Sequence, residues 1–214
     1  MAPIIYLLAF VGGFCIMSLE LLGGRVLAPY FGSSIYVWGS IITIFMLSLS
    51  VGYLLGGRLS LHHPSLGRFA LIFLAAAACL YPLVYFSEDI MTWIFERVVD
   101  PRYGSLLASG VLFIVPTVIM GMISPYSVRM LVRSTTHSGH VAGVLYFVST
   151  LGSALGTLAT SFYLVLWFEI NTILTLLTTA LLVMAALAAA ATRWGPSLPR
   201  SVSEPDPTAG RVAP

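Results

Sequence analysis

Charged residues are scarce in this chain. Only 8% of its 214 residues are Asp, Glu, Lys or Arg, and lysine is missing altogether, so all ten basic residues are arginine. An average soluble domain carries about 25% charged residues. With 58% hydrophobic residues and a net charge of +2, the composition excludes a soluble globular domain. The arginines form no concentrated basic patch, which argues against nucleic acid as a partner.

Motifs for catalysis and metal binding are also missing. The chain has no glycine-rich loop after a strand, no G-x-S-x-G and no pair of acids placed for acid/base chemistry. His137 and His140 have a metal-like spacing, but no nearby Cys or acid completes a ligand set. Cys15 and Cys79 lie inside apolar stretches and indicate no disulfide. The sequence therefore predicts no metal site and no cofactor, and it argues against catalysis by this chain alone.

Long apolar stretches, in contrast, are abundant. Each is near or above the length that a helix needs to cross a hydrocarbon core of ~30 Å. The blocks are Ile4–Leu22, Trp38–Gly57, Phe69–Phe86, Leu106–Tyr126, Ala142–Phe168 and Asn171–Thr192. We expect an all-α polytopic membrane protein, with a six-helix transmembrane domain over residues 1–194. Residues 195–214 are rich in proline and poor in large apolar side chains, which predicts a flexible cytoplasmic tail.

Charge is distributed unequally between the two sides of these spans. One side carries Arg58, Arg68, Arg129, Arg133, Arg193, Arg200 and Arg211 with Glu204 and Asp206. The other side carries Arg25, Arg97 and Arg102 with Glu20, Glu88, Asp89, Glu96, Asp100 and Glu169. Since arginine accumulates on the cytoplasmic side, both termini should be cytoplasmic. We expect a multi-pass protein of a bacterial-type inner (plasma) membrane, with Trp38, Trp93, Trp167 and Trp194 near the interfaces.

Two connecting segments show patterns of their own. Apolar residues recur at helical spacing in Ile90–Val99, which predicts an amphipathic helix along the membrane surface. Val26–Val37 combines Pro29, Gly32 and two serines with aromatic residues, which is typical of an interfacial or re-entrant turn. Tyr30 in this segment is a candidate ligand-binding residue.

Small residues mark expected helix contacts. Gly52 with Gly56, and Gly152 with Gly156, have the G-x-x-x-G spacing that lets two helix backbones approach closely in lipid. Ser149 and Ser153 lie in the same span as Gly152 and Gly156. Their hydroxyls could form hydrogen bonds across a helix interface or could line a polar pathway, and we favour the first of these roles.

Ionisable residues near the spans are the candidate functional groups. Glu20 lies in an otherwise apolar span and needs a partner, water or a proton. Gly23 and Gly24 could loosen the helix enough for Glu20 to pair with Arg25, or Glu20 could bind a ligand or relay a proton. Arg58 and Arg129 end two spans, where they could anchor the helices at the interface or bind a ligand.

Three stretches of the chain carry a family resemblance. They are SLELLGGRVLAPYFGSSIYVWGSIITIFMLSLSVGYLLGGRLS (Ser18–Ser60), PTVIMGMISPYSVRML (Pro116–Leu131) and GVLYFVSTLGSALGT (Gly143–Thr157). They resemble the membrane half of the fused major-facilitator and spermidine synthase-like proteins. The matching positions include Glu20, Gly24, Arg25, Ala28–Gly32, Gly56–Arg58, Ser124, Pro125, Arg129 and Ser149–Gly152.

The resemblance implies six helices arranged like half of a major-facilitator transporter. In relatives a soluble aminopropyltransferase-like domain follows, and we expect this chain to be the membrane module without that catalytic module. The leading hypothesis is a non-catalytic module that serves a partner protein, such as a polyamine-type synthase, or a small cationic ligand. The alternative is a structural or anchoring subunit of a larger membrane protein complex. For partners we expect the lipid bilayer and either another protein or further copies of this chain in a homo-oligomer.

Overall fold

The computed structural model describes residues 2–61, 64–132 and 138–194, without the side chains of Arg193 and Trp194. Its elements are α1 (Ala2–Phe31), α2 (Ile35–Ser60), α3 (Leu66–Arg97), α4 (Pro101–Gly121), α5 (Ile123–Leu131), α6 (Ser138–Ala159), the π-helix η2 (Thr160–Leu164), α7 (Val165–Trp167) and α8 (Ile170–Trp194). Arg133, His62, His63, His137 and the expected tail at 195–214 lie outside the described residues.

Six helical segments in the described part of the chain are long and apolar enough to cross a membrane. They are α1, α2, α3, the α4–α5 segment, the segment from α6 through α7, and Ile170–Thr192 within α8. The prediction of an all-α fold with six spans is thus confirmed, and a lipid bilayer is the environment that these helices suit.

The helix ends follow from local chemistry. Ser65 begins α3, and its hydroxyl accepts a hydrogen bond from the Arg68 backbone N–H at 3.3 Å. Asp100 does the same for α4, accepting from the Arg102 N–H at 2.9 Å, with Pro101 in the first turn. Side-chain acceptors at these positions satisfy backbone donors that a helix leaves free. Gly32, with φ +75°, turns the chain between α1 and α2.

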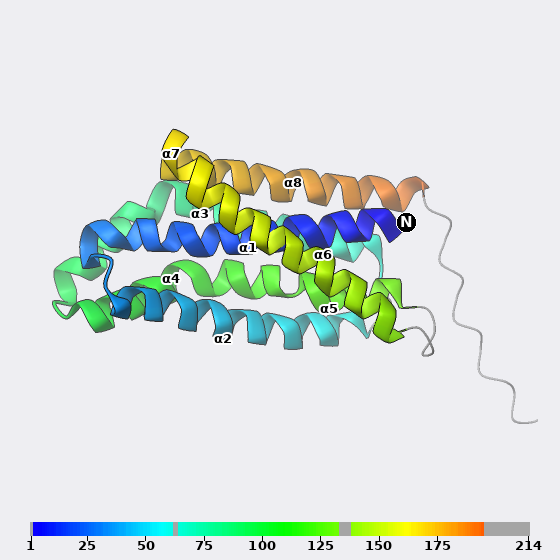
Figure 1. Ribbon diagram of the computed structural model, residues 1–214, viewed down its shortest axis with the longest axis horizontal. Helices are drawn as coiled ribbons and strands as arrows, with labels where there is room; N and C mark the ends of the chain where they lie inside the picture. The colour runs from blue at the N-terminus through cyan, green and yellow to red at the C-terminus, as the bar shows by residue number, and fades with distance from the viewer. Residues whose placement is uncertain (1, 62–63, 133–137, 195–214) are drawn as a thin grey trace, which may run out of the picture.

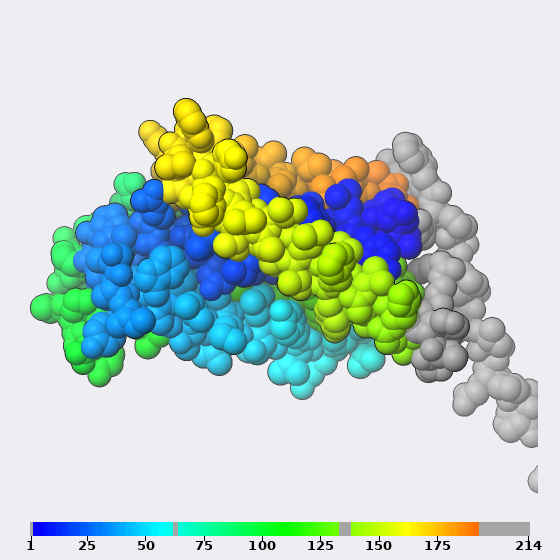
Figure 2. Space-filling model, in the orientation of Figure 1, coloured from blue at the N-terminus to red at the C-terminus, as the bar shows by residue number. Residues whose placement is uncertain are grey.

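The long helices run between two ends of an elongated bundle (Figure 1). The α7 end holds the α1–α2, α3–α4 and α7–α8 turns, and the N-terminal end holds the start of α1, the α2–α3 turn and the end of α8. The most extensive packing joins α1 to α6, α2 to α4 and α3 to α8. Figure 2 shows α6 lying obliquely across α1 on one face of the bundle.

Close backbone contacts hold these pairs together, and they involve the four glycines of the G-x-x-x-G spacings. A Cβ atom built at Gly156 would lie 2.9 Å from the Phe14 Cα, and one at Gly152 would collide with the Phe10 carbonyl oxygen. On the other side of the bundle, a Cβ at Gly52 would lie 2.9 Å from the Gly121 Cα. One at Gly56 would lie 2.6 Å from the Met122 carbonyl oxygen. These helices pack backbone to backbone, with no room for a side chain.

Two expectations about connecting segments are wrong. Ile90–Val99 does not form a separate surface helix, because α3 continues without a break to Arg97 and buries Met91 and Ile94. Val26–Val37 is wrong as a re-entrant segment and too long as a turn, because α1 continues to Phe31 and only the short link at Gly32, before α2 begins at Ile35, turns the chain. Phe95 lies 5.9 Å from the rings of both Tyr30 and Phe31, measured between centroids. The apolar faces of the two segments thus pack against each other, so protein contacts bury them in place of the membrane surface.

The fourth span is interrupted between its two prolines. α4 ends at Gly121 and α5 begins at Ile123, with the Met122 N–H bonded to the Ile119 oxygen at 3.1 Å. Pro125 lies in the first turn of α5, where its missing backbone donor costs little, whereas Pro116 lies inside α4. The interruption at Met122 thus lies just before Pro125, which has no N–H to donate to the carbonyl oxygen one turn earlier.

Candidate ligand cavity at the α7 end

A cavity of about 630 Å³ lies between the last turns of α1, the end of α3 and the junction of α7 with α8. Its polar lining consists of Arg25, Tyr30, Ser87, Glu88, Glu169 and Asn171. Its apolar lining includes Val26, Met91 and Ile173. The volume is typical of small-molecule sites, which are usually apolar with a few polar groups that orient the ligand.

The charged side chains reach this cavity from three separate elements. Arg25 comes from α1, Glu88 from α3 and Glu169 from the turn between α7 and α8. Phe168 has extended backbone angles, and this turns the chain so that Glu169 stands at the start of α8. The Ile173 N–H donates to the Glu169 carbonyl oxygen at 3.0 Å. A carboxylate at a helix N-terminus interacts favourably with the helix dipole.

Tyr30 connects two walls of the cavity. Its hydroxyl lies 3.2 Å from the Thr92 Oγ1 and donates to the Glu88 carbonyl oxygen at 3.4 Å. These contacts tie the end of α1 to the end of α3, so Tyr30 shapes the wall that positions Glu88.

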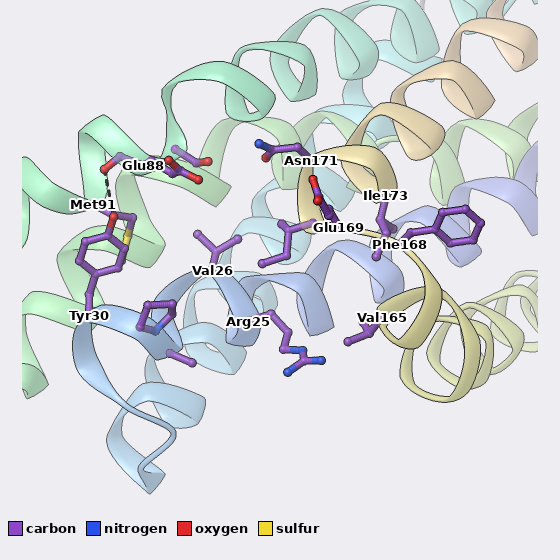
Figure 3. Close-up of a pocket in the computed structure, with 14 residues that line it drawn as sticks. Arg25, Val26, Tyr30, Glu88, Met91, Val165, Phe168, Glu169, Asn171 and Ile173 are labelled. Carbon is purple, nitrogen blue, oxygen red and sulfur yellow. Dashed lines mark hydrogen bonds between the residues drawn. The ribbon is translucent and has the colours of Figure 1, made fainter.

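Acidic and basic groups occupy opposite sides of the cavity. Figure 3 shows Glu88 and Glu169 on one side of the α1 helix and the Arg25 guanidinium on the other. All three residues are exposed. No ion pair joins them to one another in the described part of the chain. Two carboxylates against one guanidinium leave the cavity with a net negative charge, which favours a ligand with at least one positive group.

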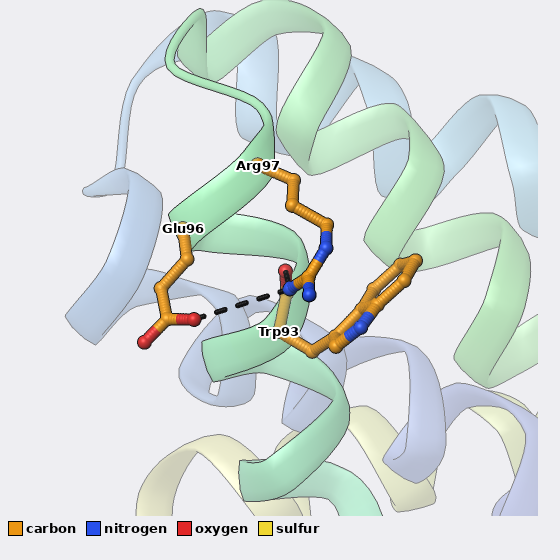
Figure 4. A network of polar contacts seen from close by, with 3 residues as sticks. All are labelled: Trp93, Glu96 and Arg97. Carbon is orange, nitrogen blue, oxygen red and sulfur yellow. Dashed lines mark hydrogen bonds and ion pairs between the residues drawn. The ribbon is translucent and has the colours of Figure 1, made fainter.

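The other two arginines at the α7 end are engaged with aromatic rings. Arg97 lies 4.3 Å from the centre of the Trp93 ring, donates to the Trp93 carbonyl oxygen at 3.0 Å and approaches Glu96 at 3.9 Å (Figure 4). Arg102 lies 4.5 Å from the centre of the Tyr36 ring. Cation–π contacts of this kind orient a guanidinium. Arg25 differs from both in lining the cavity.

Glu20 lies apart from this cavity. It is half-buried and shares a face of α1 with Gly13 and Gly24, seven and four residues away. The helix is regular between Glu20 and Arg25, and the two described residues form no ion pair. Gly23 and Gly24 do not loosen the helix, because they admit the side chains of Phe113 and Trp38, which a Cβ would meet at 3.1 Å and 2.7 Å. Five residues of regular helix place the two charges on different faces, so of the two alternatives for Glu20 the pairing with Arg25 is not formed.

The remaining candidate residues lie at the N-terminal end or between α1 and α6. Arg58 and Arg129 are in the last turns of α2 and α5. Arg129 lines a second cavity, of about 460 Å³, together with Ser60 and Pro125. The Ser153 hydroxyl donates to the Ser149 carbonyl oxygen at 3.2 Å, and that oxygen lies against Gly13. This geometry favours helix packing over a polar pathway at the two serines.

Glu169 and Asn171 were missed as candidate site residues, and Glu88 was used only in the charge count. A signal for Glu169 was the very short turn before the sixth span, which fixes an acid at a helix start. Among the described residues, no three of the types His, Cys, Asp and Glu gather closely enough to hold a metal ion. Comparison with known proteins found no match to this chain among family models, curated proteins or solved structures.

Proposed function

We propose that this chain is a non-catalytic membrane module that binds a small cationic ligand in the cavity at the α7 end and serves a partner protein. The observation that carries the proposal is the pair of carboxylates, Glu88 and Glu169, on one side of a cavity of about 630 Å³. In the described part of the chain neither carboxylate is in an ion pair, so both can accept hydrogen bonds from a ligand ammonium group.

The apolar lining supports a ligand with both charged and methylene groups. Met91 and Ile173 are buried residues that contribute to the cavity wall. A polyamine-type molecule would place its carbon chain against such side chains and its ammonium groups at Glu88 and Glu169. The polar groups would then set orientation while apolar contact adds affinity.

The packing of the helices supports the resemblance to half of a major-facilitator transporter. The first three spans are α1, α2 and α3, and the second three are α4–α5, α6–α7 and α8. In this division α1 corresponds to α4–α5, α2 to α6–α7 and α3 to α8. The contact of α1 with α6 then has its equivalent in the contact of α4 with α2, and the contact of α3 with α8 is its own equivalent. Since each set has an odd number of spans, the two sets run in opposite directions, as in inverted repeats of transporters.

A cytoplasmic location of the N-terminal end is part of the proposal. Arg58, Arg68 and Arg129 lie at that end. Arginine on one side of the bundle supports both termini in the cytoplasm of a cell with a bacterial-type inner membrane.

Binding of spermidine to the purified protein in detergent tests the proposed function. We expect Glu88→Gln and Glu169→Gln each to weaken binding roughly threefold to tenfold, because each removes one charge from a partly exposed site. Glu96→Gln is the matched control, since Glu96 lies on α3 outside the cavity and pairs with Arg97. Equal binding by wild type, Glu88→Gln and Glu169→Gln in isothermal titration calorimetry would contradict the proposal.

The alternative role, a structural or anchoring subunit, is supported by the exposed surface of the fifth span. Phe147, Phe162 and Trp167 are 67%, 63% and 77% exposed. Large aromatic side chains are common at protein contacts. Copurification from native membranes distinguishes the roles: a stable stoichiometric partner, with no spermidine binding by the complex, would favour the structural role.

A further inference from the structure

An apolar groove lies beside the charged cavity, on the surface of α6, η2 and α7. It has a volume of about 710 Å³ and is lined by Phe14 of α1 together with Leu158, Phe162, Tyr163, Leu166 and Trp167. The five residues of the fifth span are all more than half exposed. In a membrane-spanning bundle this groove faces lipid, so its natural occupant is an acyl chain or another apolar segment.

The cavity and the groove share α7 as a common wall. Val165 of α7 and Phe168, which follows α7, line the cavity, whereas Leu166 and Trp167 of α7 line the groove. The π-helix η2 precedes this wall and shifts the side-chain pattern of the span by one residue. A single ligand that passes around α7 could therefore have one part in the cavity and another in the groove, about one helix diameter (~10 Å) apart.

The cavity and the groove also follow the same face of α1. Phe14 lines the groove and Arg25 lines the cavity. Arg25 follows Phe14 by eleven positions, which complete about three helical turns, or about 16 Å along the axis. This length is close to half of the ~30 Å hydrocarbon core of a bilayer. An acyl chain of one leaflet, with its headgroup at Arg25, would therefore extend to Phe14.

We infer that the cavity and groove together bind a phospholipid whose headgroup carries a phosphate and a primary ammonium group. This inference rests on the proposed function, because it identifies the cation in the cavity as the headgroup of a lipid. Arg25 is placed to bind the phosphate, since guanidinium matches phosphate oxygens in a bidentate geometry. Glu88 and Glu169 are placed to accept hydrogen bonds from the ammonium group, and the groove takes one acyl chain.

The charges select among headgroups. A purely anionic headgroup such as phosphatidylglycerol would meet two carboxylates without supplying a positive group. A choline headgroup has the charge but no N–H donor, whereas a primary ammonium offers three. Phosphatidylethanolamine is therefore the headgroup that fits best.

Lipid binding measured by native mass spectrometry tests the inference. The full-length protein in detergent is titrated with phosphatidylethanolamine, phosphatidylcholine and phosphatidylglycerol that carry identical acyl chains. We expect wild type to bind phosphatidylethanolamine about tenfold more tightly than the other two. Ala159→Trp, which fills the groove, should weaken phosphatidylethanolamine and phosphatidylcholine alike and leave spermidine binding unchanged. Ala75→Trp, on an exposed position of α3 outside the groove, is the matched control.

The outcomes separate this inference from the proposed function. Equal affinities of wild type for the three lipids, or an Ala159→Trp variant with unchanged lipid binding, would overturn the inference. If the Glu88→Gln/Glu169→Gln double variant then still loses spermidine binding, the proposed function stands and the ligand is a soluble amine. If that double variant keeps both spermidine binding and the preference for phosphatidylethanolamine, the proposed function and the inference both fail.

Discussion

The Ser18 hydroxyl donates a buried hydrogen bond to the carbonyl oxygen of Gly156, at 3.3 Å, across the contact between α1 and α6. The bond forms because Gly156 has no side chain and its backbone lies directly against α1 at Phe14. A hydroxyl–carbonyl bond between helices adds to van der Waals contact where the surroundings are lipid.

The close helix contacts at glycine predict that the same substitution, glycine to alanine, changes stability differently at different positions. We expect Gly152→Ala to destabilise the protein by about 1–3 kcal/mol, because the added methyl group collides with the backbone of Phe10. Gly57→Ala is the matched control, since a Cβ there has no neighbour within 4 Å, and alanine in a helix should be neutral or stabilising by about 0.5–1 kcal/mol. Thermal unfolding in detergent measures both. Equal melting temperatures for the two variants would show that the α1–α6 contact is looser than described.

The separation of Glu20 from Arg25 predicts that the two charges act independently. We expect Glu20→Gln to raise stability, because it removes a half-buried charge at membrane depth. Arg25→Gln should have a small effect on stability, since Arg25 is exposed. In the double variant the two effects should add within about 0.3–0.5 kcal/mol. A larger coupling energy, with the double variant partly restoring a loss, would show that the residues pair in the membrane.

The alternation of the spans predicts the sides on which single cysteines react. In a background of Cys15→Ala and Cys79→Ala, we expect Ser33→Cys and Leu61→Cys to react with impermeant thiol reagents from opposite sides of the membrane. Ser33 is exposed in the turn at the α7 end, and Leu61 is 69% exposed at the N-terminal end. The arginine bias predicts that Leu61→Cys reacts from the cytoplasm. Labelling of both from one side would contradict the six-span arrangement.

The spans were determined by the sequence itself. Helix length and hydropathy are properties of contiguous residues, and a bilayer requires that each apolar segment satisfy its own backbone hydrogen bonds. The glycine spacings are equally local, so Gly52, Gly56, Gly152 and Gly156 could be selected without knowing which helix each one contacts.

The connecting segments could not be predicted in this way. The pattern of Ile90–Val99 correctly indicates a helix with one apolar face, but periodicity does not say what covers that face. In the tertiary structure the covering surface is the end of α1, where Phe95 meets Tyr30 and Phe31. An apolar face can be buried by lipid or by protein, and only the arrangement of the helices decides between them.

The candidate site was decided by tertiary structure alone. Glu88 and Glu169 are far apart in the sequence, and they share a cavity because the end of α3 packs beside the start of α8. Glu20 and Arg25 are close in sequence, and the regular turn of α1 keeps them apart. Nearness along the chain is thus a poor guide to which charges meet in a helical bundle. Helix rotation and packing set the distances between ionisable groups, and neither can be read from hydropathy.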